Sequence, residues 1–239
     1  MLDFNFHLED GELLGLIGPN GSGKTTVFNL ITGVYKPDEG NIIFSGRDIT
    51  GLAPYTICQQ GIARTFQNIR LFKDISVLDN VRIALHKDAP YGLLKTLLRT
   101  PGFFQGEIEI NKKAREYLQI FNLEDKAGEI ASSLPYGEQR RLEIARALAT
   151  QPTLLILDEP AAGLNPNETR ALMDLIRWIR KDFGLSILLI EHDMSLVMGV
   201  CERIYVLDYG QVIAEGLPEE IRRNKRVIEA YLGGGHKEC

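Results

Sequence analysis

The chain has 239 residues, of which 44% are hydrophobic and 25% charged, which predicts one large globular domain or a core with a smaller lobe. Its net charge of −5 argues against nucleic acid, or an anionic membrane surface, as a partner held by bulk charge. No apolar run approaches the roughly 18 residues that cross a membrane, and the three scattered cysteines predict reduced thiols. If the protein serves a membrane, we expect other chains to form the pore.

Short apolar strands alternate with helices in the first half of the chain. The strand at 13–17 runs into a glycine-rich turn, and the following helix, over 24–32, ends at Gly33. A mostly helical stretch covers about 76–123. We expect it to be interrupted near residues 89–91 and 100–106. Further strands are predicted at 41–44 and 62–66.

The second half continues the alternation, with a helix over 138–149 and a buried strand at 153–157. The next helix has a full start signal, with Asn165 as N-cap, Pro166 at the first position and Glu168 at the third. Strands at 185–190, 204–207 and 211–214 precede a helical segment over 218–232. This order predicts an α/β fold with a mainly parallel sheet and a small antiparallel edge sheet. The expected core is 1–72 with 151–239, and an inserted helical lobe covers about 73–150.

A phosphate-binding loop is predicted between the first strand and the first helix. The segment GPNGSGKT matches G-x-x-x-x-G-K-[ST] in the strand–loop–helix context that this pattern requires. Glycines let several backbone N–H groups face one anion at a helix start. Lys24 would hold the β- and γ-phosphates of ATP, and Thr25 would ligate Mg²⁺. The expected nucleotide-binding residues here are Gly18, Pro19, Asn20, Gly21, Ser22, Gly23, Lys24, Thr25 and Thr26.

Two acidic residues follow the buried strand at 153–157. The carboxyl ends of parallel strands form the ligand-binding edge of such a sheet. We therefore expect Asp158 to hold Mg²⁺ and Glu159 to orient or activate the attacking water. Solvated acids at a strand end are common, and it is the phosphate loop that favours the catalytic interpretation.

Two polar residues after other strands complete the predicted site. His192 follows the strand at 185–190, and Gln67 follows the strand at 62–66. A lone residue of either kind is more often structural, but a parallel sheet would bring both to the edge that carries Glu159. The imidazole would bond the γ-phosphate or hold the water, and the Gln67 amide would ligate Mg²⁺ and contact that water. The expected catalytic residues are Glu159, His192 and Gln67, and the expected metal ligands are Thr25, Gln67 and Asp158.

Five segments, in chain order, resemble the motifs of the ATPase subunits of ABC transporters: GPNGSGKTT, TFQ, LPYGEQRRLEIARAL, LLILDEPAAGLNP and LLIEHD. The resemblance covers nearly the whole chain and implies a P-loop (RecA-like) ATPase core that uses ATP and Mg²⁺. It also implies that two subunits pack head to tail. Each nucleotide would then lie between the phosphate loop of one subunit and the signature motif of the other. Residues 162–165 resemble the D-loop, which crosses between subunits.

The signature motif of that family, usually L-S-G-G-Q, corresponds here to Leu134, Pro135, Tyr136, Gly137 and Glu138. The resemblance implies that these residues bind the partner's nucleotide, and Gly137 opens the helix predicted over 138–149, whose N-terminus suits an anion. Pro135 replaces the usual serine and Tyr136 the first glycine, so a hydroxyl and an N–H are missing. This departure bears on how well the signature supports hydrolysis at the partner's site.

The signature helix followed by EPAAGLNPNET resembles one branch of the family, the ATPase subunits of branched-chain amino acid importers. That resemblance implies a peripheral protein at the cytoplasmic face of the inner membrane. Its partners would be a second, different ATPase chain, two membrane permease subunits and, indirectly, a substrate-binding protein. A homodimer remains the alternative assembly, and urea or short amides remain alternative solutes. A permease helix would lie beside Gln67, where Leu71, Phe72 and Ile75 line its groove or else belong to the lobe's core.

Two other classes of protein share some of these motifs. A small-molecule kinase would have the phosphate loop but no use for the signature helix or for His192. A non-transport ABC ATPase would share every motif, but such proteins usually carry two cassettes in one chain or long coiled-coil insertions. The single cassette here favours the transporter.

The aromatic residue that stacks on adenine in this family lies well upstream of the loop lysine, and only 23 residues precede Lys24. The resemblance therefore implies a chain shortened at its N-terminus. A first edge strand would then be missing, which leaves 41–44 or a strand from Asp3 with an unpaired neighbour. Phe4, Phe6 or His7 would have to substitute, although strand alternation directs Phe4 and Phe6 together into the core.

Overall fold

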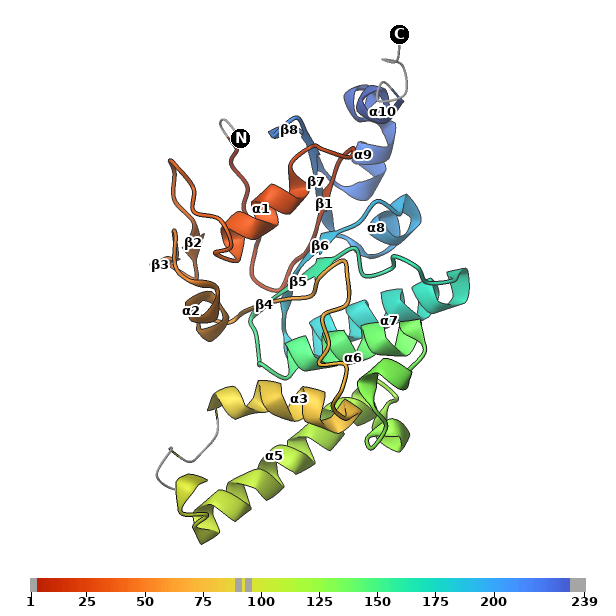
Figure 1. Cartoon of the computed structure of the whole chain (residues 1–239). Helices are drawn as coiled ribbons and strands as arrows, with labels where there is room; N and C mark the ends of the chain where they lie inside the picture. Colours follow the sequence, from red (N-terminus) through yellow and green to blue (C-terminus); the bar gives the residue numbers. More distant parts are fainter. Residues whose placement is uncertain (1–3, 89–91, 93–95, 233–239) are drawn as a thin grey trace. The chain divides into compact units, whose positions relative to one another are not determined.

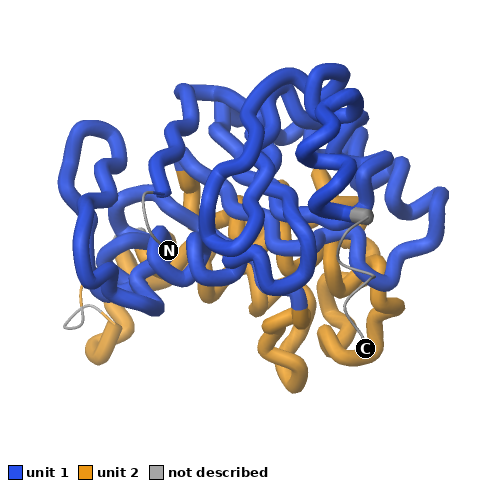
Figure 2. The backbone as a smooth tube through the Cα atoms, turned by 90° about the horizontal axis from the view of Figure 1, so that it is seen from above, with its two compact units in different colours: residues 1–67, 153–239 blue, residues 68–152 orange. Residues whose placement is uncertain are grey.

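The computed structural model describes residues 4–88, 92 and 96–232, and its backbone divides into two compact units (Figures 1 and 2). Unit 1 takes its residues from 1–67 and 153–239, and unit 2 from 68–152. No helix within the described ranges is long and apolar enough to cross a membrane.

Unit 1 is built on a six-stranded sheet with the order β4-β5-β6-β1-β7-β8. Its neighbouring strands are parallel except for the antiparallel pair β7–β8, which confirms the predicted fold class. Ile190 lies opposite both Leu16 and Asp158, so β1, β5 and β6 end level and the loops that follow them share one edge. The strands are β1 (Leu13–Ile17), β4 (Ile62–Arg64), β5 (Leu154–Asp158), β6 (Ser186–Ile190), β7 (Arg203–Asp208) and β8 (Gln211–Gly216).

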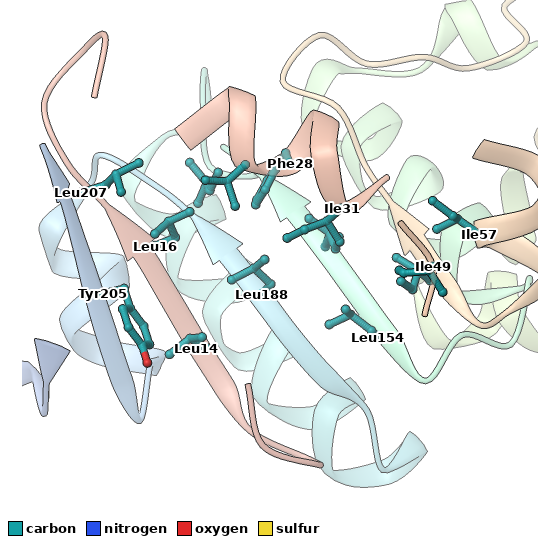
Figure 3. Packing of buried hydrophobic residues seen from close by; sticks show 14 residues of the cluster. Leu14, Leu16, Phe28, Ile31, Ile49, Ile57, Leu154, Leu188, Tyr205 and Leu207 are labelled. Carbon is teal, nitrogen blue, oxygen red and sulfur yellow. The ribbon is translucent and has the colours of Figure 1, made fainter. Parts of the chain in front are cut away.

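Helices cover both faces of this sheet because its central strands are apolar on both sides. On one face, α1 (Lys24–Ile31) packs Phe28 and Ile31 onto the core cluster, against side chains from β1, β5 and β6 (Figure 3). On the other face, Gly15 lies so close to the chain at α8 (Met194–Val200) that an added Cβ would be 3.0 Å from the Cys201 Sγ. The sheet edge that carries the loops is therefore held by packing from both sides.

The helix α7 (Pro166–Phe183) begins as predicted. The Asn165 side-chain oxygen accepts hydrogen bonds from the backbone N–H groups of Asn167 and Glu168. In turn, the Glu168 carboxylate accepts a bond from the Asn165 N–H. Gly184 ends the helix in the left-handed conformation, with φ of 62°. The C-terminal segment differs from the prediction of one helix. It forms α9 (Pro218–Arg223) and α10 (Lys225–Leu232), because Asn224 is extended and its side chain caps the second helix.

The N-terminal part of unit 1 contains the predicted small antiparallel sheet. The segment 41–44 narrows to β2 (Ile43–Phe44), which pairs with β3 (Arg47–Asp48), and each of these two strands has one edge without a strand partner among the described residues. The described residues 4–8 form no strand, yet they alternate between half-buried and exposed. Phe4 and Phe6 pack against the core cluster as the alternation predicts, with ring centroids 5.8 Å apart. The helix α2 (Pro54–Gln59) completes the part of unit 1 before β4.

Unit 2 is helical, as expected for the inserted lobe. The interruption predicted near 100–106 occurs at 98–100, where residues 98–99 form a turn and Thr100 is extended. It does not reach 106, because Pro101 occupies the first position of a helix and begins α5. The interruption predicted near 89–91 lies outside the described residues. The helical elements of unit 2 that the structure describes are α3 (Val77–Leu85), η1 (His86–Asp88), α5 (Pro101–Ile120), η2 (Glu124–Lys126), η3 (Ala131–Ser133) and α6 (Tyr136–Leu148).

Candidate nucleotide-binding site

The predicted phosphate loop lies between β1 and α1, at the edge where the parallel strands end. Gly18 has a φ of 155°, and a Cβ there would come within 2.0 Å of the Leu207 carbonyl oxygen, so only glycine fits against β7. The Gly210 N–H donates to the Ser22 carbonyl, which ties the loop to the β7–β8 hairpin. The loop therefore has a backbone shape that the neighbouring strands maintain.

Lys24 lies inside the curve of this loop. Its Nζ donates to the carbonyl oxygens of Gly18 at 2.7 Å and Pro19 at 2.9 Å, and the residue is only 9% exposed. Burial lowers the pKa of Lys24, while the carboxylates of Glu159 and Asp158 partly oppose that shift. The ammonium group thus stands between the loop and the two acids.

The loop also holds polar groups suited to an anion. The buried Ser22 Oγ has no hydrogen-bond partner in the described part of the chain, and an unpaired buried hydroxyl is costly unless a ligand engages it. Gly23 caps α1 without a side-chain oxygen, so the first amides of the helix are not covered by a cap. Asn20, Gly21, Thr25 and Thr26 are exposed at the loop and the first turn. These features fit a bound phosphate group.

Asp158 ends β5 almost fully buried, and it forms an ion pair that the sequence reasoning missed. Its Oδ2 accepts a bond of 2.7 Å from Arg64 Nη2 on β4. The same guanidinium donates to Asn29 Oδ1 of α1 and lies 5.2 Å from the ring centroid of Phe28. An arginine inside a buried strand is the signal that could have revealed the pair. No described residue donates to Asp158 Oδ1, and a carboxylate oxygen is a ligand that Mg²⁺ favours.

The three predicted catalytic residues come together beyond β5. Glu159 Oε2 accepts a bond of 2.7 Å from Gln67 Nε2 and lies 3.7 Å from His192 Nδ1. Glu159 has a φ of 45°, an uncommon conformation for a residue with a side chain, and its N–H donates to the Ile190 carbonyl. The arrangement places a carboxylate, an amide and an imidazole where a water molecule could be held.

The signature residues belong to unit 2, so they form a separate group. The helix α6 begins at Tyr136, two residues earlier than predicted, because Pro135 occupies the N-cap and leaves Gly137 inside the first turn. Glu138 binds Lys126 at 2.6 Å, and Leu134 is buried. No side chain caps this helix, and the Glu138 N–H donates to the Pro135 carbonyl. The amides that suit an anion here are therefore those of Tyr136 and Gly137.

Comparison with known proteins identifies the family. The family model described as ABC transporter matches residues 1–162, and one described as Branched-chain amino acid ATP-binding cassette transporter matches residues 211–237. The chain is 50% identical to the high-affinity branched-chain amino acid transport ATP-binding protein LivG of Salmonella typhimurium, over 96% of this chain and 90% of that protein. It is 47% identical to BraF of Pseudomonas aeruginosa, with the same coverage.

Solved structures agree with this assignment. The ADP conformation of MJ1267, an ATP-binding cassette of an ABC transporter, has a TM-score of 0.80 at 33% identity, and the match covers 95% of this chain and 89% of that one. The resemblance inferred from the motifs is thereby confirmed. The chain belongs to the family of ABC transporter ATP-binding proteins.

Proposed function

We propose that this chain is the ATP-hydrolysing subunit that energises an ABC importer of branched-chain amino acids. The curated relatives named above are transport ATP-binding proteins for these solutes. The observation that carries the chemical part is the contact of Gln67 and His192 with Glu159, on the same sheet edge as the phosphate loop. No feature of the described residues favours urea or short amides.

The predicted site residues of unit 1 each have a proposed role in hydrolysis. Lys24 and the amides of the phosphate loop bind the phosphates, and Glu159 takes the proton of the attacking water. Gln67 and His192 orient that water and the γ-phosphate. Mg²⁺, held by Thr25, Asp158 and Gln67, would neutralise charge on the phosphates.

The proposed assembly places the chain beside other subunits. Its permease partners would form the membrane path and hold it at the cytoplasmic face of the inner membrane, and a substrate-binding protein would deliver the solute to them. Pro135 and Tyr136 leave the signature without the usual serine hydroxyl, which supports a second, different ATPase chain as the dimer partner. Phe72 is half exposed, and Leu71 and Ile75 are partly buried, consistent with a groove for a permease helix.

Uptake in cells that lack this chain tests the proposal. Uptake of radiolabelled leucine, isoleucine and valine should fall and urea uptake should not change. The wild-type gene should restore uptake, and the Lys24→Ala gene should not. Normal amino-acid uptake without the chain, or loss of urea uptake alone, would contradict the proposed solute.

A further inference from the structure

Glu191 is a buried carboxylate that the mechanism above does not use. It directly follows β6 and is 1% exposed. Its Oε1 accepts a bond of 2.7 Å from the Ala161 N–H, and its Oε2 accepts one of 3.2 Å from the His192 N–H. Burial raises the pKa of Glu191, and the backbone N–H groups of Ala161, Asp193 and His192 oppose this shift. Each oxygen of the Glu191 carboxylate thus accepts a hydrogen bond from a backbone N–H group.

The two loops that meet at Glu191 carry the proposed catalytic residues. Ala161 comes two residues after Glu159, and His192 follows Glu191 directly. The left-handed backbone at Glu159 is unfavourable for a residue with a side chain, so the surrounding structure must hold it. On one side the Glu159 N–H is fixed to the Ile190 carbonyl at 2.9 Å. On the other side, the Ala162 N–H donates to the Glu159 carbonyl at 3.2 Å, and the Ala161 N–H ties the turn to Glu191.

We propose that Glu191 is a positioning residue for ATP hydrolysis, whose carboxylate holds the turn at Glu159 and the backbone of His192 in one arrangement. It acts through the Glu159 carboxylate and the His192 imidazole. The inference rests on the hydrolytic roles proposed for those two residues.

The substitution Glu191→Gln tests this with little change of shape. Its amide keeps one acceptor oxygen but turns an N–H₂ group toward a backbone donor, so one of the two tethers is lost. We expect kcat to fall by about 10- to 100-fold, because small displacements of catalytic groups have effects of this size. KM for ATP and the Kd of ATP should stay within about twofold, since the phosphate loop is untouched.

The measurement uses the full chain purified with its membrane subunits, and turnover is expressed per bound ATP so that misfolded protein does not count. The matched control is Glu12→Gln, which removes a buried carboxylate in the same unit that pairs with Arg203 at 2.7 Å and lies outside the site. It should lower thermal stability and leave kcat per bound ATP unchanged. If Glu12→Gln lowers kcat per bound ATP as much as Glu191→Gln does, the effect of Glu191→Gln is general destabilisation, and the proposal is overturned.

A double-mutant cycle with Glu159→Gln separates positioning from an independent effect. If Glu191 acts through Glu159 and His192, then adding Glu191→Gln to the Glu159→Gln variant should lower turnover by clearly less than the roughly 10- to 100-fold loss that Glu191→Gln causes in the wild type. Full multiplication of the two losses would overturn the proposal, as would wild-type kcat in Glu191→Gln. If Glu159→Gln itself keeps wild-type turnover, the proposed hydrolytic site is wrong, which is a different outcome from failure of Glu191 alone.

Discussion

Lys24 binds its own loop, since its ammonium group donates to the carbonyl oxygens of Gly18 and Pro19. Lys24→Ala therefore removes the proposed phosphate ligand and two contacts that shape the loop. A charged hydrogen bond contributes about 1.5–3 kcal/mol, so we expect the Kd of ATP to rise by about 10- to 100-fold. Titration calorimetry measures it. Lys36→Ala, at an exposed lysine of the same unit, is the control and should bind normally. ATP binding by Lys24→Ala at the wild-type affinity would reject the assigned loop.

Arg64 and Asp158 form a buried pair whose charges depend on each other. Arg64→Met leaves the carboxylate buried without its cation, which should destabilise unit 1 by about 3–5 kcal/mol. Adding Asp158→Asn removes the uncompensated charge and should restore part of that loss. Urea denaturation of the wild type and the two variants measures the effect. Equal stability of Arg64→Met and the wild type would show that the pair does not hold β4 to β5.

The motifs predicted the site residues from their spacing, but the contacts that fix them were not visible in the sequence. Gln67, Glu159 and His192 each follow a strand, and a parallel sheet aligns strand ends, so their meeting could be anticipated. An arginine inside a buried strand signals that Arg64 needs an acid, but it does not name Asp158, 94 positions away in the chain. The bond of Glu191 to the Ala161 N–H, 30 positions away, has no signal in the sequence. Only the register of β4, β5 and β6 brings them together.

At the scale of elements, the start of α7 shows what residues close together in the sequence can predict. The capping bonds of Asn165 and Glu168 join residues within three positions of each other, so the start of the helix was predictable from the sequence. The β2–β3 pairing and the break at Asn224 were missed because two-residue strands and a single extended residue give no periodicity. Local chemistry thus predicts helix starts better than it predicts short pairings.

The cap of α7 gives a prediction at this scale. Asn165→Ala removes an acceptor for the N–H groups of Asn167 and Glu168, and it should lower the free energy of unfolding by about 1 kcal/mol. Asn167→Ala, two residues after the cap, removes only a weak contact with Arg170. It should change the free energy of unfolding by less than about 0.5 kcal/mol. Urea denaturation compares the two, and equal losses would show that Asn165 is not the cap that matters.

At the scale of the whole molecule, lowering the pH should lower the stability of unit 1 through Glu12, the residue just before β1. Burial raises the pKa of Glu12, but the bonds from Arg203 and the Glu9 N–H outweigh it and lower that pKa below its ordinary 4.5. A lowered folded-state pKa stabilises the protein above the unfolded-state value, and this stabilisation is lost as the pH falls through the folded value. Thermal melts from about pH 6 to about pH 3 should therefore show a steeper loss for the wild type than for Glu12→Gln. Parallel curves would exclude Glu12 as a source of the acid sensitivity.

The claim that matters most for the whole molecule is that hydrolysis at Glu159 powers solute import. The direct measurement is leucine transport by proteoliposomes that contain the assembled importer and ATP on the side of this chain. We predict ATP-driven transport for the wild type. For Glu159→Gln we predict retained ATP binding with hydrolysis and transport lower by about 10²- to 10⁴-fold, the range for loss of a general base. Transport by Glu159→Gln at the wild-type rate would contradict the account.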